Sequence, residues 1–301
     1  MTSGGQNASR DGRRLVCLGF GFSARAVCAL AAEAGYEIVG TARSPERLDL
    51  VTRLGGRGVV FDGQSRSAEL ASLLAGASHV LVSVPPGNEG DPALALHGAD
   101  LEAAAGLSWI GYLSTVGVYG DRQGGWVDES TPPAPTSQRS RWRLAADEQW
   151  LEFGRRTGTC VEVFRLAGIY GPGRSAFDAL RKGTARRIDS PGQVFNRIHV
   201  EDIARGVWAA MTGSRRGGVY NFADDEPAPA HEVTAFAAGL LGLDPPPLVP
   251  IAQASLSPMA ASFYAECKRV RNGQLKTLLG GSLRYPSYRE GLRGILRAEQ
   301  D

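Results

Sequence analysis

Short apolar runs alternate with helix-spaced segments along the first half of the chain. The first run, Arg14–Gly19, leads into a glycine turn, and Ser23–Gly35 continues with Ala, Val and Leu at helical spacing. Short Gly or Pro connections join such units, which predicts parallel strands linked by right-handed crossovers. The same alternation predicts further strands at Tyr36–Thr41, Gly58–Phe61, His79–Val84, Ser108–Ser114 and Cys160–Arg165, and further helices at Pro45–Leu54, Ser67–Ala75, Pro92–Ala105 and Gln138–Phe153.

The second half of the chain loses this regularity. Ser175–Gln193 and Pro227–Ala265 are Pro-rich and predicted to be irregular, whereas a helix at Val200–Met211 and a strand at Gly218–Phe222 lie between them. Insertions of this kind commonly cover the carboxyl edge of a Rossmann-type sheet, where such folds bind ligands. The predicted fold class is therefore α/β, a Rossmann-type doubly wound parallel sheet with a smaller C-terminal substrate lobe.

The same pattern divides the chain into ranges. We expect a disordered tail at 1–11, a dinucleotide-binding Rossmann domain at 12–170 and a mixed C-terminal part at 171–301. Within that last part, 171–196 and 224–268 are predicted to form the substrate lobe, and 197–223 to return to the Rossmann domain.

Composition narrows the classes of partner. The net charge is +2 and the arginines are scattered, which argues against a nucleic-acid partner. No apolar run approaches the roughly 18 to 20 residues that a membrane span requires, so no membrane partner is expected. Four widely spaced cysteines form neither a CxxC pair nor a metal cluster with the histidines, which favours a reduced, cytoplasmic protein without a metal site. Trp142 and Trp150 share a helix face, which is interpreted either as part of a dimer interface or as core packing. The chain is therefore expected to be a monomer or a homodimer.

The strongest chemical signal is the GFGFSA turn between the first strand and helix. Gly19 permits the tight turn, Gly21 lets the backbone approach a pyrophosphate, and Ala24 allows close packing of the helix. The helix N-terminus offers free N–H groups and a partial positive charge to the phosphates. The alternative is a glycine turn that only packs. Predicted cofactor contacts are Gly19, Phe20, Gly21, Phe22, Ser23 and Ala24, with Val84, Pro85 and Ala167 further along the chain.

The end of the second strand favours NADP over NAD. An acidic residue there would bond the ribose 2′-hydroxyl, whereas an arginine pairs with a 2′-phosphate. This strand ends in GTARS, so Arg43 is placed for phosphate, with Thr41 and Ser44 as hydrogen-bond partners. A solvated surface arginine is the alternative. Asp62, after the third strand, is interpreted either as an acceptor for the adenine amino group or as a turn residue.

An ordered series of motifs follows the cofactor turn: LSTVGVYGD at Leu113–Asp121, ESTPPAP at Glu129–Pro135, RLAGIYGPGR at Arg165–Arg174, RIHVEDIA at Arg197–Ala204 and GVYNFADDE at Gly218–Glu226. Over most of its length the chain thus resembles the extended short-chain dehydrogenase/reductase family, the NAD(P)-dependent epimerase/dehydratase-like proteins. The resemblance implies that Thr115 hydrogen-bonds a substrate carbonyl or hydroxyl, with Ser114 as the second candidate. A strand-end hydroxyl that caps local backbone is the other interpretation of either residue.

The resemblance fails at the family's catalytic YxxxK pair on the long helix. Arg139 stands where the tyrosine is expected and Arg143 where the lysine is expected. A phenol with a lowered pKa exchanges a proton with the substrate oxygen, which an always-protonated arginine does not do. Arg143 is interpreted either as a group that stabilises a developing alkoxide or as a helix-surface charge. The chain is therefore similar to an atypical member of the family.

These residues predict an NADP(H)-binding oxidoreductase or epimerase-like protein that acts by hydride transfer on a small polar carbonyl or hydroxyl substrate. The catalytic candidates are Thr115, Ser114 and Arg143, and the proton source is unidentified. One alternative is a non-catalytic NADP(H)-binding sensor or regulatory protein, favoured by the lost Tyr and Lys. A weaker alternative is a nucleotide-sugar epimerase or dehydratase.

Overall fold

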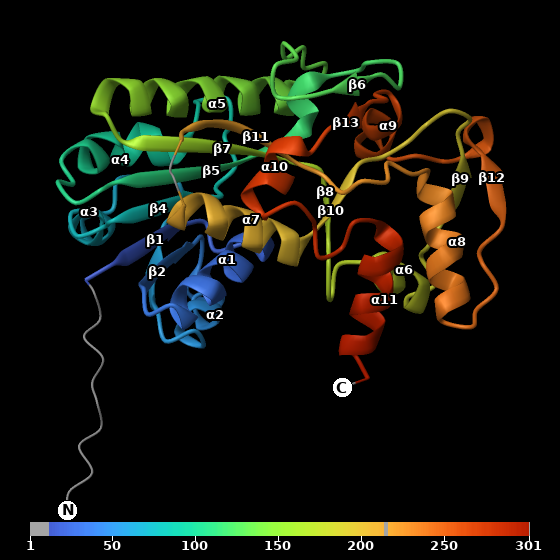
Figure 1. The fold of residues 1–301 in the computed structure, drawn as a ribbon, viewed down its shortest axis with the longest axis horizontal. Helices are drawn as coiled ribbons and strands as arrows, with labels where there is room; N and C mark the ends of the chain where they lie inside the picture. Colours follow the sequence, from blue (N-terminus) through green and yellow to red (C-terminus); the bar gives the residue numbers. More distant parts are fainter. Residues whose placement is uncertain (1–11, 214–215, 301) are drawn as a thin grey trace, which may run out of the picture.

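A parallel sheet of seven strands forms the body of the molecule (Figure 1). The computed structural model describes residues 12–213 and 216–300, so the predicted disordered tail at 1–11 lies outside the described residues. The strand order is β11-β7-β5-β4-β1-β2-β3, and every pairing within this sheet is parallel. The strands are β1 (Arg14–Leu18), β2 (Glu37–Ala42), β3 (Arg57–Val60), β4 (His79–Val82), β5 (Trp109–Thr115), β7 (Cys160–Leu166) and β11 (Gly218–Phe222). The predicted α/β class and doubly wound sheet are confirmed.

The strand order reverses between β1 and β4, because the chain first runs outward through β2 and β3 and then returns to β4 on the other side of β1. Loops that leave neighbouring strands at such a switch point diverge and open a crevice at the carboxyl edge. The predicted cofactor turn follows β1 and therefore lies at this crevice.

Helices cover both faces of the sheet, which explains the unbroken apolar runs of its strands. Side chains in β1 alternate, so Leu15 and Cys17 join one core while Val16 and Leu18 join the other. The first core includes residues of α1 (Phe22–Glu33), α2 (Asp49–Thr52), α7 (Val200–Thr212) and α10 (Gly273–Leu278). The second includes residues of α3 (Ala68–Leu74), α4 (Pro92–Glu102) and α5 (Gln138–Thr157).

Several predicted boundaries needed correction. The helix expected at Pro45–Leu54 is split into η1 (Pro45–Arg47) and α2, because the N–H groups of Arg47 and Leu48 bond to carbonyls three residues back. The strand expected at His79–Val84 ends at Val82, since the next two N–H groups both donate to Leu18 O. The long helix continues past Phe153 to Thr157 and ends at a left-handed glycine.

The C-terminal lobe is more regular than predicted. The segments 175–193 and 227–265, expected to be irregular, contain short helices and strands that pair with distant partners. Apart from the 11-residue helix α8, which the sequence analysis missed, these elements have three to seven residues and show too little period to be recognised, and the pairing of the strands depends on remote segments. The lobe and its connections comprise β8 (Gly168–Tyr170), α6 (Ala176–Arg181), β9 (Arg187–Asp189), β10 (Arg197–His199), α8 (Ala230–Leu240), β12 (Leu248–Pro250), η3 (Ile251–Gln253), α9 (Pro258–Tyr264) and α11 (Tyr288–Ala298).

Two parallel pairs, β10 with β8 and β12 with β9, form small sheets beside the main one. Residues of α6, α8 and α11 share a separate small core that includes Phe177, Ala237 and Leu292. This lobe lies beyond the carboxyl ends of the main strands (Figure 1). In the described part of the chain, no helix combines the length and apolar character needed to span a bilayer.

Candidate functional site

The turn after β1 is held in shape from beneath by β2. Gly19 has a φ of +93°, and a Cβ there would lie 2.9 Å from Val84 N, so only glycine fits. Gly19 N donates to Thr41 Oγ1 at 2.8 Å, and Phe20 N donates to Thr41 O at 2.8 Å. Thr41 is fully buried. Its hydroxyl therefore supports the turn and does not lie on the surface beside Arg43, where it was predicted.

Among the described residues, no side chain caps the first turn of α1. Gly21 is its N-cap residue and provides no side-chain hydrogen bond, and the first turn contains no acidic residue. A Cβ on Gly21 would have no atom closer than Ser83 Oγ at 3.9 Å, so the space in front of the turn is open. Ala24 is fully buried and lets the helix pack closely. The free first-turn N–H groups and the open approach fit the diphosphate of a dinucleotide.

A second group at this turn was not predicted. Gly171 and Arg174 bond to each other through both backbone N–H groups, and a Cβ on Gly171 would lie 3.3 Å from the Phe22 ring. The Arg174 guanidinium lies 5.6 Å from the centre of the Phe22 ring and is exposed. A cation from a distant loop therefore stands beside the first residue of α1. The only sequence signal for this cation was the GPGR motif at Gly171–Arg174, and no local pattern shows which turn that loop contacts.

The ends of β2 and β3 carry the other predicted cofactor residues. Arg43 is exposed and Ser44 follows it as the N-cap residue of η1. Asp62 is exposed and accepts a hydrogen bond from Gln64 N at 2.8 Å, so it forms the turn that was one of its two interpretations. Val84 and Pro85 follow β4, and Ala167 directly follows β7 with its N–H bonded to Phe222 O. All of them lie at carboxyl ends of strands.

The two strand-end hydroxyls of β5 face different surroundings. Thr115 is partly exposed, and its Oγ1 accepts from Gly117 N at 3.1 Å, at the start of η2 (Val116–Tyr119). Ser114 is 6% exposed, and its Oγ has no hydrogen-bond partner of normal geometry among the described residues. It nevertheless lies close enough to Asp147 to lower the pKa of that carboxyl. Thr115 is therefore partly open to solvent, whereas Ser114 is buried near Asp147 of α5.

Arg143 points from α5 into the end of the sheet. Its Nη1 donates to Tyr112 Oη and to Leu113 O, each at 3.0 Å. Two buried carboxyls, Asp91 and Asp147, lie near enough for its charge to lower their pKa values, although burial raises both overall. The surface-charge interpretation of Arg143 does not fit this position. It fits a group that orients the end of β5, where the catalytic candidates begin.

A buried polar chain runs beneath the candidate site. Arg165 Nε donates to Asp147 Oδ2 at 3.0 Å, and Arg165 Nη1 donates to Tyr119 Oη at 3.0 Å. Tyr119 Oη in turn donates to Asn221 Oδ1 at 2.8 Å. Burial is the main cause that raises the pKa of Asp147 to about 6. These hydrogen bonds connect α5, β7, η2 and β11. Tyr119 is fully buried and therefore supports the site from within the core.

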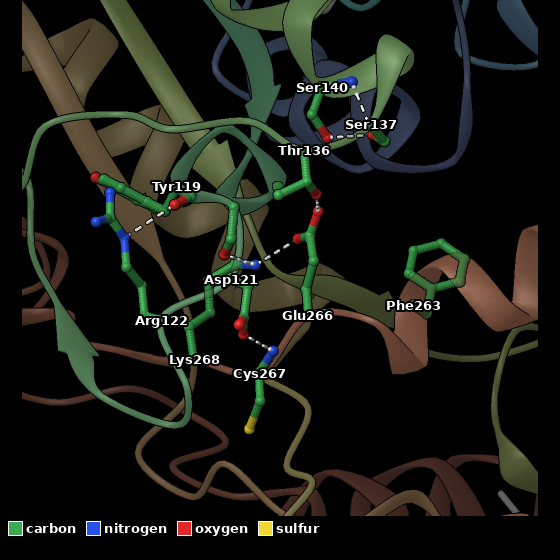
Figure 2. A network of polar contacts seen from close by, with 12 residues as sticks. Tyr119, Asp121, Arg122, Thr136, Ser137, Ser140, Phe263, Glu266, Cys267 and Lys268 are labelled. Carbon is green, nitrogen blue, oxygen red and sulfur yellow. Dashed lines mark hydrogen bonds and ion pairs between the residues drawn. The ribbon is translucent and has the colours of Figure 1, made fainter.

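Sequence reasoning also missed the hydroxyl pair that begins α5 (Figure 2). Ser137 caps the helix by accepting from Ser140 N at 3.2 Å, and its Oγ donates to Ser140 Oγ at 2.9 Å. Ser140 is 8% exposed, whereas Arg139 beside it is exposed. A serine directly before a helical segment is a preferred N-cap residue, and this is the signal that a sequence offers for such a cap.

A C-terminal segment, 263–268, is fastened across the loop between η2 and α5; we name it the strap (Figure 2). Lys268 Nζ donates to Gly120 O and pairs with Glu266 Oε2, each at 2.7 Å. Thr136 donates to the other oxygen of Glu266, and Cys267 N donates to Asp121 Oδ1 at 2.8 Å. The strap joins the C-terminal lobe to the loop that carries the candidate site. In the described ranges, no group of His, Cys, Asp and Glu is arranged to hold a metal ion.

Comparison with known proteins agrees with this geometry. Residues 15–223 match the family model described as the NAD dependent epimerase/dehydratase family. A solved structure of a functionally unknown conserved protein from Silicibacter pomeroyi DSS is 46% identical, covers 95% of this chain and 99% of that one, and superposes with a TM-score of 0.87.

Two curated proteins are similar over part of their length. Protein YeeZ of Escherichia coli (strain K12) is 36% identical over 139 residues, which are 45% of this chain and 47% of that protein. The 3-diazoavenalumate denitrifying reductase of a Streptomyces species is 32% identical over 143 residues, 43% of this chain and 45% of that protein. The match thus spans about half the length of these curated relatives.

Proposed function

Because the chain belongs to the NAD-dependent epimerase/dehydratase family, we propose that it is an NADP(H)-dependent oxidoreductase acting on a small polar carbonyl or hydroxyl compound. The observation that carries the proposal is the uncapped start of α1 behind the open Gly21 turn. Peptide N–H groups there would hold the diphosphate, and Arg174 would add a cation beside it. When bound, the nicotinamide supplies or accepts a hydride.

Preference for NADP over NAD rests on Arg43. Its guanidinium is exposed at the end of β2, where a ribose 2′-phosphate would lie, and Ser44 adjoins it. An arginine in this place pairs with phosphate through two parallel hydrogen bonds. Neither Arg43 nor Ser44 has a carboxylate that could bond a ribose 2′-hydroxyl, which supports the same preference for NADP.

The reacting oxygen of the substrate would lie beside Thr115. The Thr115 hydroxyl already accepts from Gly117 N and keeps its own proton to donate. Arg143 fixes the strand end through Leu113 O and contributes positive charge nearby. Hydrogen bonds aimed at an oxygen that gains negative charge lower the barrier to its reduction.

A second function is favoured by Arg139 and Arg143, which replace the family's proton-transferring pair: a protein that binds NADP(H) without turnover and reports it to a partner. Similarity to a reductase from Streptomyces supports the enzyme instead. A nucleotide-sugar epimerase or dehydratase remains a third and weaker alternative.

One substitution distinguishes the enzyme hypothesis from the sensor hypothesis. Wild-type protein and Thr115→Val would be mixed with NADPH and a panel of aldehydes and ketones, and nicotinamide absorbance followed. For the enzyme we expect carbonyl-dependent oxidation of NADPH by the wild type, at least about a hundredfold slower in Thr115→Val, with equal NADPH affinity. Tight NADPH binding without oxidation by any carbonyl would favour the sensor.

A further inference from the structure

The proposed reduction needs a proton, and the family's usual source is missing. Where the tyrosine is expected the chain has Arg139, which is exposed and stays protonated. Tyr119 and Tyr112 are fully buried, and burial raises the pKa of each phenol. The residue after Arg139, however, turns a hydroxyl inward from the same helix end.

Ser140 and Ser137 form a short hydrogen-bonded path at the start of α5 (Figure 2). Ser137 Oγ donates to Ser140 Oγ at 2.9 Å, and Ser140 is 8% exposed. Ser137 is partly exposed and so reaches solvent. The positive end of α5 stabilises any negative charge that builds on these oxygens. One end of the path is therefore wet and the other is buried.

The buried end of the path lies near Thr115, beside a glycine. A Cβ on Gly117 would lie 2.9 Å from Ser140 Oγ and 3.3 Å from Thr115 Oγ1. Both hydroxyls thus lie beside Gly117, whose missing side chain allows this close approach, and in the described part of the chain no hydrogen bond joins them directly. Among the described residues, neither hydroxyl donates to a protein acceptor, so both protons are available.

We propose that Ser137 and Ser140 form a hydroxyl relay that carries a proton from solvent to Thr115 through one bridging water beside Gly117. The proposal rests on the proposed function. Thr115 is the group that touches the substrate oxygen, and the two serines act through it. A hydroxyl accepts a proton on a lone pair while it gives up its own, so the relay needs no group that titrates near neutrality.

The step balances in the reductive direction. The carbonyl carbon receives a hydride with its electron pair from NADPH, so the carbonyl is reduced and the nicotinamide is oxidised. The π bond of the carbonyl opens onto oxygen, which takes the Thr115 proton. Ser140 passes a proton to Thr115 through one bridging water, Ser137 restores the proton of Ser140, and solvent water restores that of Ser137. One hydride and one solvent proton are consumed, and the product is the alcohol.

Replacing the buried serine tests the relay. Ser140→Ala would be compared with wild type and with Ser140→Thr, which keeps a hydroxyl. The readouts are the single-turnover rate of hydride transfer to a carbonyl that the wild type reduces, NADPH affinity by nicotinamide fluorescence, and the melting temperature. We expect Ser140→Ala to lower the rate by about a hundredfold with affinity and melting unchanged, and Ser140→Thr to restore most of it.

A second pair of variants separates the relay from helix capping. Ser137→Asp keeps a good cap oxygen but carries no hydroxyl proton at pH 7, whereas Ser137→Ala loses both. We expect both variants to slow hydride transfer equally and only Ser137→Ala to melt at lower temperature.

The outcomes distinguish this proposal from the function on which it rests. If the wild type reduces a carbonyl and Ser140→Ala does so at the same rate, the relay is overturned and the function stands. If Ser137→Asp keeps the wild-type rate, the path to solvent is overturned. If none of the aldehydes and ketones in the panel supports oxidation of NADPH by the wild type, both proposals are overturned.

Discussion

Two arginines from distant parts of the chain stand at the proposed cofactor cleft, and their positions give them different tasks. Arg43 is exposed directly after β2, where we propose that it meets the ribose 2′-phosphate of NADP(H). Arg174 lies beside Phe22 at the start of α1, where the diphosphate common to both dinucleotides would lie. Neither arginine forms an ion pair with another described residue, so each charge remains free for a ligand.

Substituting each arginine should therefore give different affinity patterns. Arg43→Ala is expected to weaken NADPH by tenfold or more, because a hydrogen bond to a charged group contributes about 1.5–3 kcal/mol, and to leave NADH unchanged. Arg174→Ala is expected to weaken both equally. Calorimetric titration with each nucleotide measures this, with exposed Arg53→Ala as the control. Equal losses of NADPH and NADH in Arg43→Ala would remove the proposed preference.

Among the individual elements, α7 begins at a residue whose protonation makes the stability of the fold depend on pH. His199 is the N-cap residue of α7, and its Nδ1 accepts from Glu201 N at 3.2 Å. The ring is buried, and burial, with a smaller contribution from Arg284, lowers the pKa of His199 to about 4. An unfolded histidine titrates near pH 6.5, so between these values the unfolded chain binds a proton that the folded chain does not.

The free energy of unfolding should consequently fall as pH drops from about 6.5 toward 4, by about 3 kcal/mol from this group. His199→Asn keeps a capping oxygen and does not titrate in this range. Urea unfolding at pH 7 and pH 4.5 should show a larger loss for wild type than for the variant. Equal losses would mean that the ring charges in the folded protein.

The strap is a second element whose packing is testable. Lys268 and Glu266 are mostly buried, so removing one charge leaves the other without its partner. Lys268→Met should lower the free energy of unfolding by about 3 kcal/mol. Adding Glu266→Gln, which keeps an acceptor for Thr136, should recover part of that loss. Urea titrations of the wild type, Lys268→Met, Glu266→Gln and the double variant measure the coupling, and strictly additive losses would show that the pair does not hold the strap.

At the scale of the whole molecule, the main sheet could be predicted because helices cover both of its faces. That burial forces apolar runs such as those of β1 and β4 into the sequence. The GFGFSA turn could be predicted because its tight local backbone geometry requires glycine. The Gly120–Lys268 contact could not, because it depends on which loops meet after folding, whereas the Ser137–Ser140 pair is a local helix cap that the sequence analysis overlooked. The contact of Arg174 could not be predicted either, because its partner Phe22 is adjacent in space but far earlier in the sequence.

The central claim is that the first-turn N–H groups of α1 hold the diphosphate of a nicotinamide dinucleotide. Gly21 has a φ of −83° and an open approach, so Gly21→Asp fits the fold, and its carboxylate would cap those N–H groups itself. Calorimetric titration of both proteins with NADPH tests the claim most directly. We predict saturable binding by the wild type and none by Gly21→Asp, with an equal or higher melting temperature for the variant. Equal affinity of the two proteins for NADPH would contradict the account.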